Sequence, residues 1–155
     1  MSVSHAPDGW SCGFCDLAAG GETLRTKRAA VVLVAHDMTA FVASHWWPGN
    51  PGHVLVIPNQ HIENLYEFPS ELGGALIDTT RRIAVALKQA YGCDGISTRQ
   101  HNEPAGNQDV WHFHQHVFPR WHGDGLYQRH LERAEADPDE VARRAALLRK
   151  HLDGS

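Results

Sequence analysis

The sequence predicts an α+β fold: an antiparallel sheet of about five strands, with one long helix packed on it and a second helix at the C-terminus. Five short segments rich in β-branched and aromatic residues are bounded by Pro, Gly and other turn residues. Two longer segments repeat apolar residues at helical spacing. The links among the strands are short, which favours antiparallel pairing over a doubly wound parallel sheet.

The strands are expected over residues 29–37, 39–46, 52–58, 95–101 and 109–119. A tight turn joins the first two segments. The third begins after the turn formed by Pro51 and Gly52 and is expected to end at Pro58. Pro119 ends the fifth, because proline cannot donate a hydrogen bond to a neighbouring strand.

The long helix is expected to begin with Ser70 as its N-cap and to end before Gly92. Its apolar positions are Leu72, Leu76, Ile83, Leu87 and Tyr91. The second helix is expected over about 138–152, with Asp137 as N-cap, Pro138 at the first position and Glu140 completing a capping box. Its apolar stripe consists of Val141, Ala145, Leu148 and Leu152.

The length of 155 residues predicts a single domain over 1–155. The chain is 42% hydrophobic and 21% charged, as in ordinary globular proteins. A net charge of −4 without a long Lys/Arg run argues against nucleic acid as a partner. No apolar stretch approaches the length of a membrane span, and the first residues lack a signal-peptide pattern. We therefore expect a cytoplasmic protein with no membrane partner.

The number and the spacing of the cysteines and histidines require a chemical explanation. The three cysteines are an odd number, and a reducing cytosol disfavours structural disulfides. Cys12 and Cys15 form a C-x-x-C motif, which is typical of a metal half-site or a redox pair, whereas Cys93 is expected to be a small buried hydrophobe. The chain also contains twelve histidines, an unusual number beside fourteen Lys plus Arg.

Three of those histidines alternate within "WHFHQHVFPR" (111–120). On a strand, His112, His114 and His116 would project from one face, about 7 Å apart at their Cα atoms. One interpretation is a half-exposed strand whose polar face happens to be histidine. The others are a zinc site, since neutral imidazole is a common ligand, and a histidine nucleophile that attacks phosphorus.

The segment "HFHQHVF" (112–118) resembles the H-x-H-x-H signature of the histidine triad (HIT) family of nucleotide hydrolases and transferases. Three further segments resemble the same family in the same order. They are "CGFCDLAAGG" (12–21), "NPGHVLVIPNQHI" (50–62) and "HNEPAGNQDVW" (101–111). The resemblance covers about 10–121 as the core of a HIT-like fold and leaves 122–155 as a C-terminal extension.

The resemblance implies an enzyme that acts on the α-phosphate of nucleoside phosphoramidates or dinucleoside polyphosphates through a covalent nucleotidyl-histidine intermediate. It implies that His114 is the nucleophile, that His116 contacts and positions the phosphate, and that His53 forms a hydrogen bond within the triad. It also implies that the amide of Gln108 holds a non-bridging phosphate oxygen. No cofactor is expected to be required for catalysis.

Three positions depart from the family pattern near the substrate. Asp109 stands where relatives have Ser or Thr near the leaving group, and a carboxylate beside phosphate must be protonated or turned away. Asn102 is the candidate for the upstream amide contact, but it precedes Gln108 by six residues where the pattern has seven. His101 stands at seven, so the loop is either shortened or rearranged.

The third departure is His45, at the position that resembles the family's ribose-binding residue, which is usually acidic or an amide. A neutral imidazole could still form a hydrogen bond with a hydroxyl. Trp46 and Trp47 follow it, and they either stack on a nucleotide base or cover the edge of the sheet.

The resemblance further implies a structural zinc ion held by Cys12, Cys15, His61 and His112, which would form a closed tetrahedral Cys₂His₂ set. In that case His112 need not be catalytic. The alternatives are that Cys12 and Cys15 are ordinary small residues, or that they form a redox pair.

Two other functions remain open from the sequence. One is a nucleotidyltransferase similar to galactose-1-phosphate uridylyltransferase, although that enzyme has Gln at the position of His116. The other is a nucleotide-binding regulatory dimer with weak catalysis, which should keep the ribose contact and lose His114. In each case the partner is a small nucleotide, and the resemblance implies a homodimer.

Overall fold

The computed structural model describes residues 3–152. Five strands form one antiparallel sheet in the order β1-β2-β4-β6-β5. Their bounds are Val31–Val34 (β1), Met38–Val42 (β2), Val54–Pro58 (β4), Gln115–Arg120 (β6) and Gly95–Gln100 (β5). The predicted α+β fold, with its antiparallel five-stranded sheet, is therefore confirmed.

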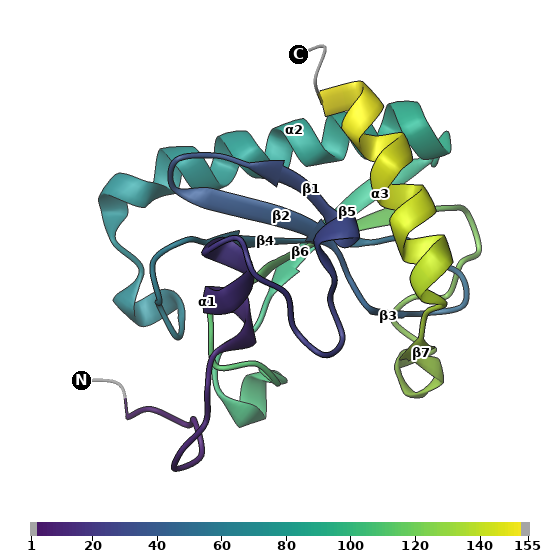
Figure 1. Ribbon diagram of the computed structural model, residues 1–155. Coiled ribbons are helices and arrows are strands. Elements are labelled where there is room, and N and C mark those ends of the chain that lie inside the picture. The colour runs from purple at the N-terminus through teal and green to yellow at the C-terminus, as the bar shows by residue number, and fades with distance from the viewer. Residues whose placement is uncertain (1–2, 153–155) are drawn as a thin grey trace.

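Helix α2 (Gly73–Tyr91) runs along one face of this sheet, and α3 (Pro138–Leu152) crosses the same face near β1 (Figure 1). Ser70 does not cap α2 as expected: it begins a short 3-10 turn, and the α-helix starts at Gly73. The predicted end is correct, because Gly92 adopts a left-handed conformation (φ 62°) that closes the helix by donating its N–H to Lys88.

The C-terminal helix has the predicted bounds. Asp137 caps it, accepting the N–H of Asp139 at 2.8 Å. Glu140 pairs with Arg143 and not with the cap, so the second half of the expected capping box is missing. The predicted apolar stripe is buried: Val141, Ala145, Leu148 and Leu152. In the part of the chain that the structure describes, no helix has both the length and the apolarity needed to cross a membrane.

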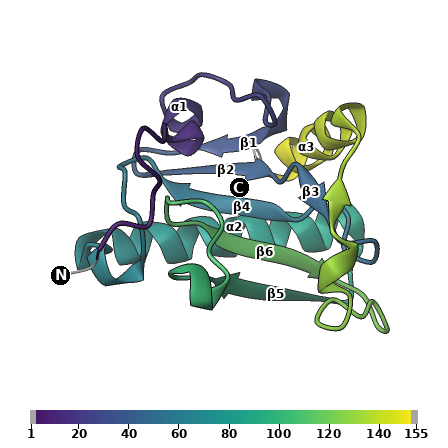
Figure 2. The ribbon, with the colours of Figure 1, turned by 90° about the horizontal axis from the view of Figure 1, so that it is seen from below.

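Strand alternation divides the core into two layers. Val54, Val56 and Val117 face the helices and join the larger cluster with Ile83 and Leu87 of α2. Leu55 and Ile57 face the other side, next to Phe41 of β2. Leu17 of the short helix α1 (Gly13–Ala18) packs in the same cluster. Figure 2 looks onto this second face with α2 behind the sheet. His53, His114 and His116 lie on this face, on the same side of the sheet as Phe41 and Leu55.

The second expected strand, 39–46, is interrupted. Strand β2 ends at Val42, and His45–Trp46 form a separate strand β3 that pairs with β7 (Ala134–Glu135). This small two-stranded sheet brings the C-terminal extension back beside β3, as the course of β7 in Figure 2 shows.

The fifth expected strand, 109–119, was predicted to start too early. Strand β6 begins at Gln115, and the preceding residues form an irregular segment. Other hydrogen bonds replace the ladder there: Phe113 donates its N–H to Ile62, and the His112 ring donates to the carbonyl of Pro58. His112 and His114 therefore do not belong to a regular strand, and their positions depend on these contacts.

Candidate active site

A cavity of about 550 Å³ lies on the face of the sheet opposite the helices. Its polar lining includes the predicted residues His45, His53, Asp109, His114 and His116. Its apolar lining includes Trp10, Phe14, Leu24, Phe41 and Leu55. The volume and the mixture of apolar walls with a few polar groups are typical of a small-molecule site.

His114 presents Nε2 to this cavity, and a hydrogen bond at Nδ1 fixes the tautomer of its ring. Its Nδ1–H donates to the carbonyl of His112 at 2.8 Å, which places the proton of the neutral ring on Nδ1 and leaves the lone pair on Nε2. Phe14 contacts the ring edge-on, with centroids 5.6 Å apart. Burial lowers the pKa of His114, so the ring is neutral at pH 7. A neutral imidazole with a free Nε2 can act as a nucleophile.

His53 and His116 form a stack with Phe118. The rings of His53 and His116 are 5.6 Å apart at 26°, and both stack on Phe118. Burial lowers the pKa of His53 to about 3 and that of His116 well below its usual value. The expected hydrogen bond from His53 into the triad is replaced by stacking: between residues 3 and 152, none joins it to His114 or His116. Nδ1 of both His53 and His116 is buried without a partner.

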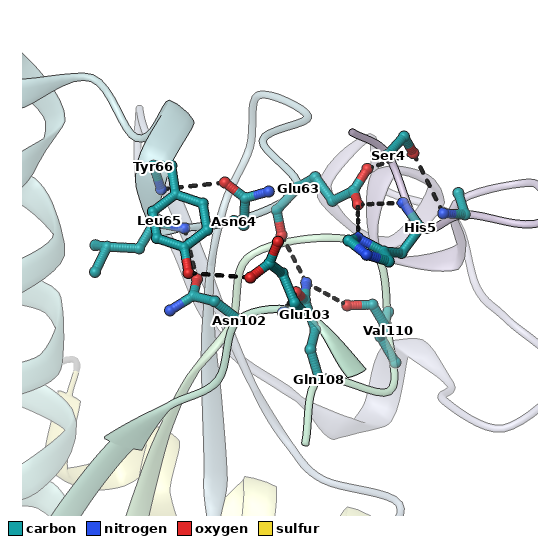
Figure 3. Close-up of polar contacts among 11 residues, drawn as sticks. Ser4, His5, Glu63, Asn64, Leu65, Tyr66, Asn102, Glu103, Gln108 and Val110 are labelled. Carbon is teal, nitrogen blue, oxygen red and sulfur yellow. Dashed lines mark hydrogen bonds and ion pairs between the residues drawn. The ribbon is translucent and has the colours of Figure 1, made fainter. Parts of the chain in front are cut away.

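Gln108 has no free donor for a phosphate. Figure 3 shows its amide between two loops: Nε2 donates to the carbonyls of Glu63 at 2.7 Å and Val110 at 3.0 Å, while Oε1 accepts the N–H of Glu103. The side chain is buried and does not line the cavity. Its expected phosphate contact would require breaking these bonds, so the geometry assigns it to holding the loop.

Asn102 also points away from the cavity. Its Oδ1 accepts the N–H of Leu65 at 2.7 Å (Figure 3). It also accepts the side-chain amide of Gln100 at 2.9 Å. His101 instead lines an adjoining cavity, and its ring contacts that of His116 edge-on at 5.6 Å. The expected substrate contact of Asn102 is therefore replaced by a structural one, and His101 occupies the place near the site.

Two residues of this loop have a positive φ. Glu103 has φ 64° and Asn107 has φ 69°, a region that favours glycine. Glu103 begins the short 3-10 turn Pro104–Gly106 and Asn107 ends it, so both unusual conformations lie at the ends of this turn, directly before Gln108.

Asp109 lies between His114 and an arginine that the sequence analysis did not identify. One carboxylate oxygen is 3.8 Å from Nε2 of His114, and the other accepts from Arg133 at 3.2 Å. Arg133 immediately precedes β7, so the pairing of β7 with β3 delivers it to the site. No local signal in "LERAEADPDE" marks this arginine, because its position depends on that long-range pairing.

His45 and the two tryptophans that follow it were the remaining candidates for contact with the nucleoside. His45 lines the cavity as predicted, and its Nδ1 is 3.0 Å from the hydroxyl oxygen of Ser44. Burial lowers the pKa of His45, and Arg133 adds to this effect. Trp46 and Trp47 do not line the 550 Å³ cavity. Trp46 packs under Arg144, and Trp47 contacts His53 and Phe118, so both cover the sheet and neither is placed to stack on a base there.

A second set of side chains meets at the N-terminal side of the same segment. The ligand atoms of Cys12, Cys15, His61 and His112 all lie within 4.8 Å of one another. Cys12 Sγ is 3.2 Å from Nδ1 of His112, and Cys15 Sγ is 3.3 Å from Nδ1 of His61. Helix α1 carries Cys15, with Cys12 as its N-cap.

This cluster fits a tetrahedral metal ion. Zinc bonds of about 2.3 Å to sulfur and 2.0 Å to nitrogen place such ligand atoms roughly 3.5 Å apart. Nε2–H of His112 donates to the carbonyl of Pro58 at 2.9 Å, which turns the lone pair of Nδ1 toward the two sulfur atoms. Four protein ligands close the coordination sphere, so the cluster is compatible with a structural zinc.

The chain is similar to known proteins along most of its length. The family model of the HIT domain matches residues 26–123. "Protein hit" of Bacillus subtilis is 33% identical over 94% of this chain and 97% of its own length. An adenylylsulfatase of Arabidopsis thaliana is 31% identical over 91% of this chain and 69% of its own length.

The structural comparison agrees with the sequence comparison. A zinc-bound histidine triad family protein from Mycobacterium smegmatis superimposes with a TM-score of 0.75 at 30% identity, covering 93% of this chain and 94% of that one. The matched region contains the sheet, the long helix and the segment with the three alternating histidines. The chain therefore belongs to the HIT family.

Proposed function

We propose that this protein is a nucleotide hydrolase or nucleotidyltransferase that uses His114 as its nucleophile. The observation that carries the proposal is the fixed tautomer of His114: its proton lies on Nδ1, and Nε2 faces a cavity large enough for a nucleotide. Membership of the HIT family supports nucleotide chemistry in general. The relative named adenylylsulfatase supports substrates with an adenylyl group.

The first step forms a bond between Nε2 of His114 and the α-phosphorus while the bond to the leaving group breaks. The imidazole then carries a positive charge, and the carbonyl of His112, which accepts the Nδ1–H, stabilises that charge. In the second step, water attacks the same phosphorus and loses a proton to solvent, while the electron pair of the breaking P–N bond returns to Nε2. His114 is then neutral again, and the nucleoside monophosphate leaves.

The remaining histidines bind and position the substrate. His116 and His53 are neutral and buried, and each has an Nδ1 without a partner. Neutral imidazoles can donate one hydrogen bond to a phosphate oxygen without the cost of burying a charge. We assign to His45 a hydrogen bond with a ribose hydroxyl and to Phe41 and Leu55 an apolar contact with the base, and the position of all three in the lining of the cavity supports these roles.

Asp109 and Arg133 complete the leaving-group side. A free carboxylate beside the phosphate would repel it, and the ion pair with Arg133 offsets this repulsion. We propose that Gln108 and Asn102 act only indirectly, by fixing the loop that carries Asp109.

The test is steady-state turnover on adenosine phosphoramidate, diadenosine polyphosphates and their guanosine counterparts, together with acid-quench trapping of the protein-bound nucleotide. We expect release of nucleoside monophosphate from at least one substrate class, and a labelled nucleotide attached to the protein early in the reaction. Turnover without any trapped nucleotide in single-turnover experiments would argue for direct attack by water. Absence of turnover on the whole panel would contradict the proposal.

We also propose that Cys12, Cys15, His61 and His112 hold a structural zinc. The distances among their ligand atoms and the orientation of His112 support this assignment. The ion would pin the N-terminal segment to the sheet, and no step of the reaction passes through it.

We propose in addition that the protein is a homodimer, as the family resemblance implies. Ile77 and Val85 are exposed apolar residues on α2, with 68% and 45% of their surfaces accessible. Light scattering should give twice the monomer mass for the wild type and the monomer mass for Ile77→Glu. The same change at the exposed Leu131, which lies outside α2, is the control.

A further inference from the structure

A second cavity, of about 240 Å³, adjoins the catalytic cavity. Asp109, His116 and Arg133 line both, so the two cavities meet at the reacting centre. The residues that line only the second cavity are Trp47, Arg99, His101, Asn107 and His130. The second cavity is therefore placed to receive what is attached to the α-phosphate on the side away from the nucleoside.

Arg99 is the charged group of this cavity that has no protein counter-ion. It stands opposite His116 in the pairing of β5 with β6, so both side chains project from the same face. Its guanidinium lies over the rings of Phe118 at 4.6 Å and Trp47 at 5.1 Å. Nε is buried without a hydrogen-bond partner, and Arg99 forms no ion pair with any residue between 3 and 152.

This environment is unusual for an arginine. A guanidinium that is partly removed from water normally pairs with a carboxylate, because an unpaired buried charge is costly. The acid of the second cavity is Asp109, and Arg133 already occupies one of its oxygens. Burial lowers the pKa of Arg99, and the positive charges of Arg120 and Arg133 act in the same direction. A bound anion would supply the missing partner.

The proton that a leaving group needs also favours an anion over an amine at this site. An amine leaving group must take up a proton as the P–N bond breaks, whereas a phosphate or sulfate leaves as a stable anion. One oxygen of Asp109 accepts from Arg133 and the other lies 3.8 Å from Nε2 of His114, so the carboxylate is placed as an acceptor in this ion pair and not as a proton donor. The site therefore lacks an acid at this position and has a free cation close by.

On the basis of the proposed function, we propose that Arg99 makes the second cavity a leaving-group subsite, which selects nucleotidyl substrates whose leaving group is a tetrahedral oxyanion. Arg99 is a specificity-determining residue that contacts the leaving group. When Nε2 of His114 bonds to the α-phosphorus, the electron pair of the breaking P–O bond goes to the departing anion, which Arg99 stabilises.

The experiment measures kcat/KM for three substrates that share the adenylyl group: diadenosine triphosphate, adenylyl sulfate and adenosine phosphoramidate. The variants are Arg99→Met, which removes the charge, and Arg99→Lys, which keeps it. Arg143→Met is the matched control, because Arg143 is exposed on α3. The readout is the ratio of the value for each anionic-leaving substrate to that for the phosphoramidate.

We expect Arg99→Met to lower this ratio about 10- to 100-fold, the effect of one hydrogen bond to a charged group. We expect Arg99→Lys to restore part of the ratio and Arg143→Met to leave it at the wild-type value. A decrease with diadenosine triphosphate alone identifies a phosphate chain as the ligand, and a decrease with both anionic substrates identifies any oxyanion. An unchanged ratio overturns the proposal, even if all three rates fall together through partial misfolding.

A binding measurement separates this proposal from the proposed function. If the wild type releases no nucleotide from any substrate, the proposed function fails. Calorimetric titration with AMP and ATP then tests the subsite alone. Tighter binding of ATP than of AMP that disappears in Arg99→Met supports the subsite, and equal binding by the wild type overturns it.

Discussion

His112 and His114 are two residues apart, yet the structure orients their rings in opposite senses. His112 donates from Nε2 to the carbonyl of Pro58 and turns Nδ1 toward two cysteines. His114 donates from Nδ1 to the carbonyl of His112 and leaves Nε2 free at the cavity. The backbone acceptor that each ring meets therefore decides which nitrogen is available, and with it whether the residue suits a metal or phosphorus.

The two regions also differ in burial. In the Cys₂His₂ cluster, Cys12 and Cys15 are partly exposed, His61 is exposed and only His112 is buried. In the group proposed to be catalytic, His53, His114 and His116 are all buried. We therefore expect changes in the metal cluster to act mainly on stability, and changes in the catalytic group to act mainly on chemistry.

The largest expected effect is the loss of turnover in His114→Asn, by at least about a thousandfold. Asparagine can still donate an N–H toward the carbonyl of His112, but it has no nitrogen lone pair to attack phosphorus. Zinc content by elemental analysis and the unfolding temperature should remain at wild-type values. His114→Gly should behave alike in turnover, and full activity in either variant would remove His114 as the nucleophile.

The second-largest expected effect is on stability and not on turnover. Cys12→Ser should release zinc and lower the free energy of unfolding by about 3 kcal/mol, since a structural metal contributes directly to folding. For a chain of this size, such a loss corresponds to roughly 6–12 °C in the unfolding temperature. The control is Cys93→Ala, which should keep its zinc. A Cys12→Ser protein as stable as the wild type, or wild-type protein without zinc, would contradict the structural role.

A pH experiment distinguishes the buried histidines from those of the metal cluster. Burial holds the pKa of His53 at about 3 in the folded protein, against about 6.5 when unfolded. Between these values the unfolded chain binds the extra proton, so stability falls as the pH is lowered below about 6.5. From pH 7 to 5, this one group costs about 2 kcal/mol.

The matched variant is His53→Phe, which keeps an aromatic ring on Phe118 but cannot titrate. Chemical denaturation at pH 7 and pH 5 should give a smaller loss of stability for the variant, by about 2 kcal/mol. The difference between the two proteins cancels any contribution from zinc release, which both share. Equal losses in both proteins would show that His53 titrates normally in the folded state.

The smallest expected effect concerns the ion pair between Asp109 and Arg133. Arg133→Met should raise KM for a nucleotide substrate about tenfold, because it leaves a carboxylate uncompensated beside the phosphate. The double variant with Asp109→Asn should recover most of this loss, since the repulsion is gone. If the two changes were simply additive, the pair would not act as a unit.

Local patterns were sufficient for most of the fold. The continuous apolar run in "GHVLVIP" and the stripe that includes Ile83 and Leu87 depend on near neighbours, and the structure bears both out. The strand boundaries were wrong where long-range bonds compete with local preference. Residues 109–114 leave the expected strand because Phe113 bonds to Ile62 and His112 to Pro58.

The loop between β5 and β6 shows a limit of motif matching. From spacing alone, Asn102 resembled the substrate contact and Gln108 the phosphate ligand. The amides of both side chains bond within the protein, as the polar network around Glu63 shows. A sequence motif identifies a residue type at a position, but it does not tell whether the side chain already has partners.

The sequence by itself determined the sheet and helices, the alternation of three histidines, and the pairing of C-x-x-C with two of the chain's histidines as candidate ligands. The first two follow from local periodicity and from residue chemistry, and the set of candidate ligands follows from the resemblance to the HIT family. Only the tertiary structure decided which nitrogen of each ring is free, because that depends on a carbonyl supplied by another residue. It also decided that Arg133 and Arg99 lie at the site, because strand pairing across long sequence distances places them there.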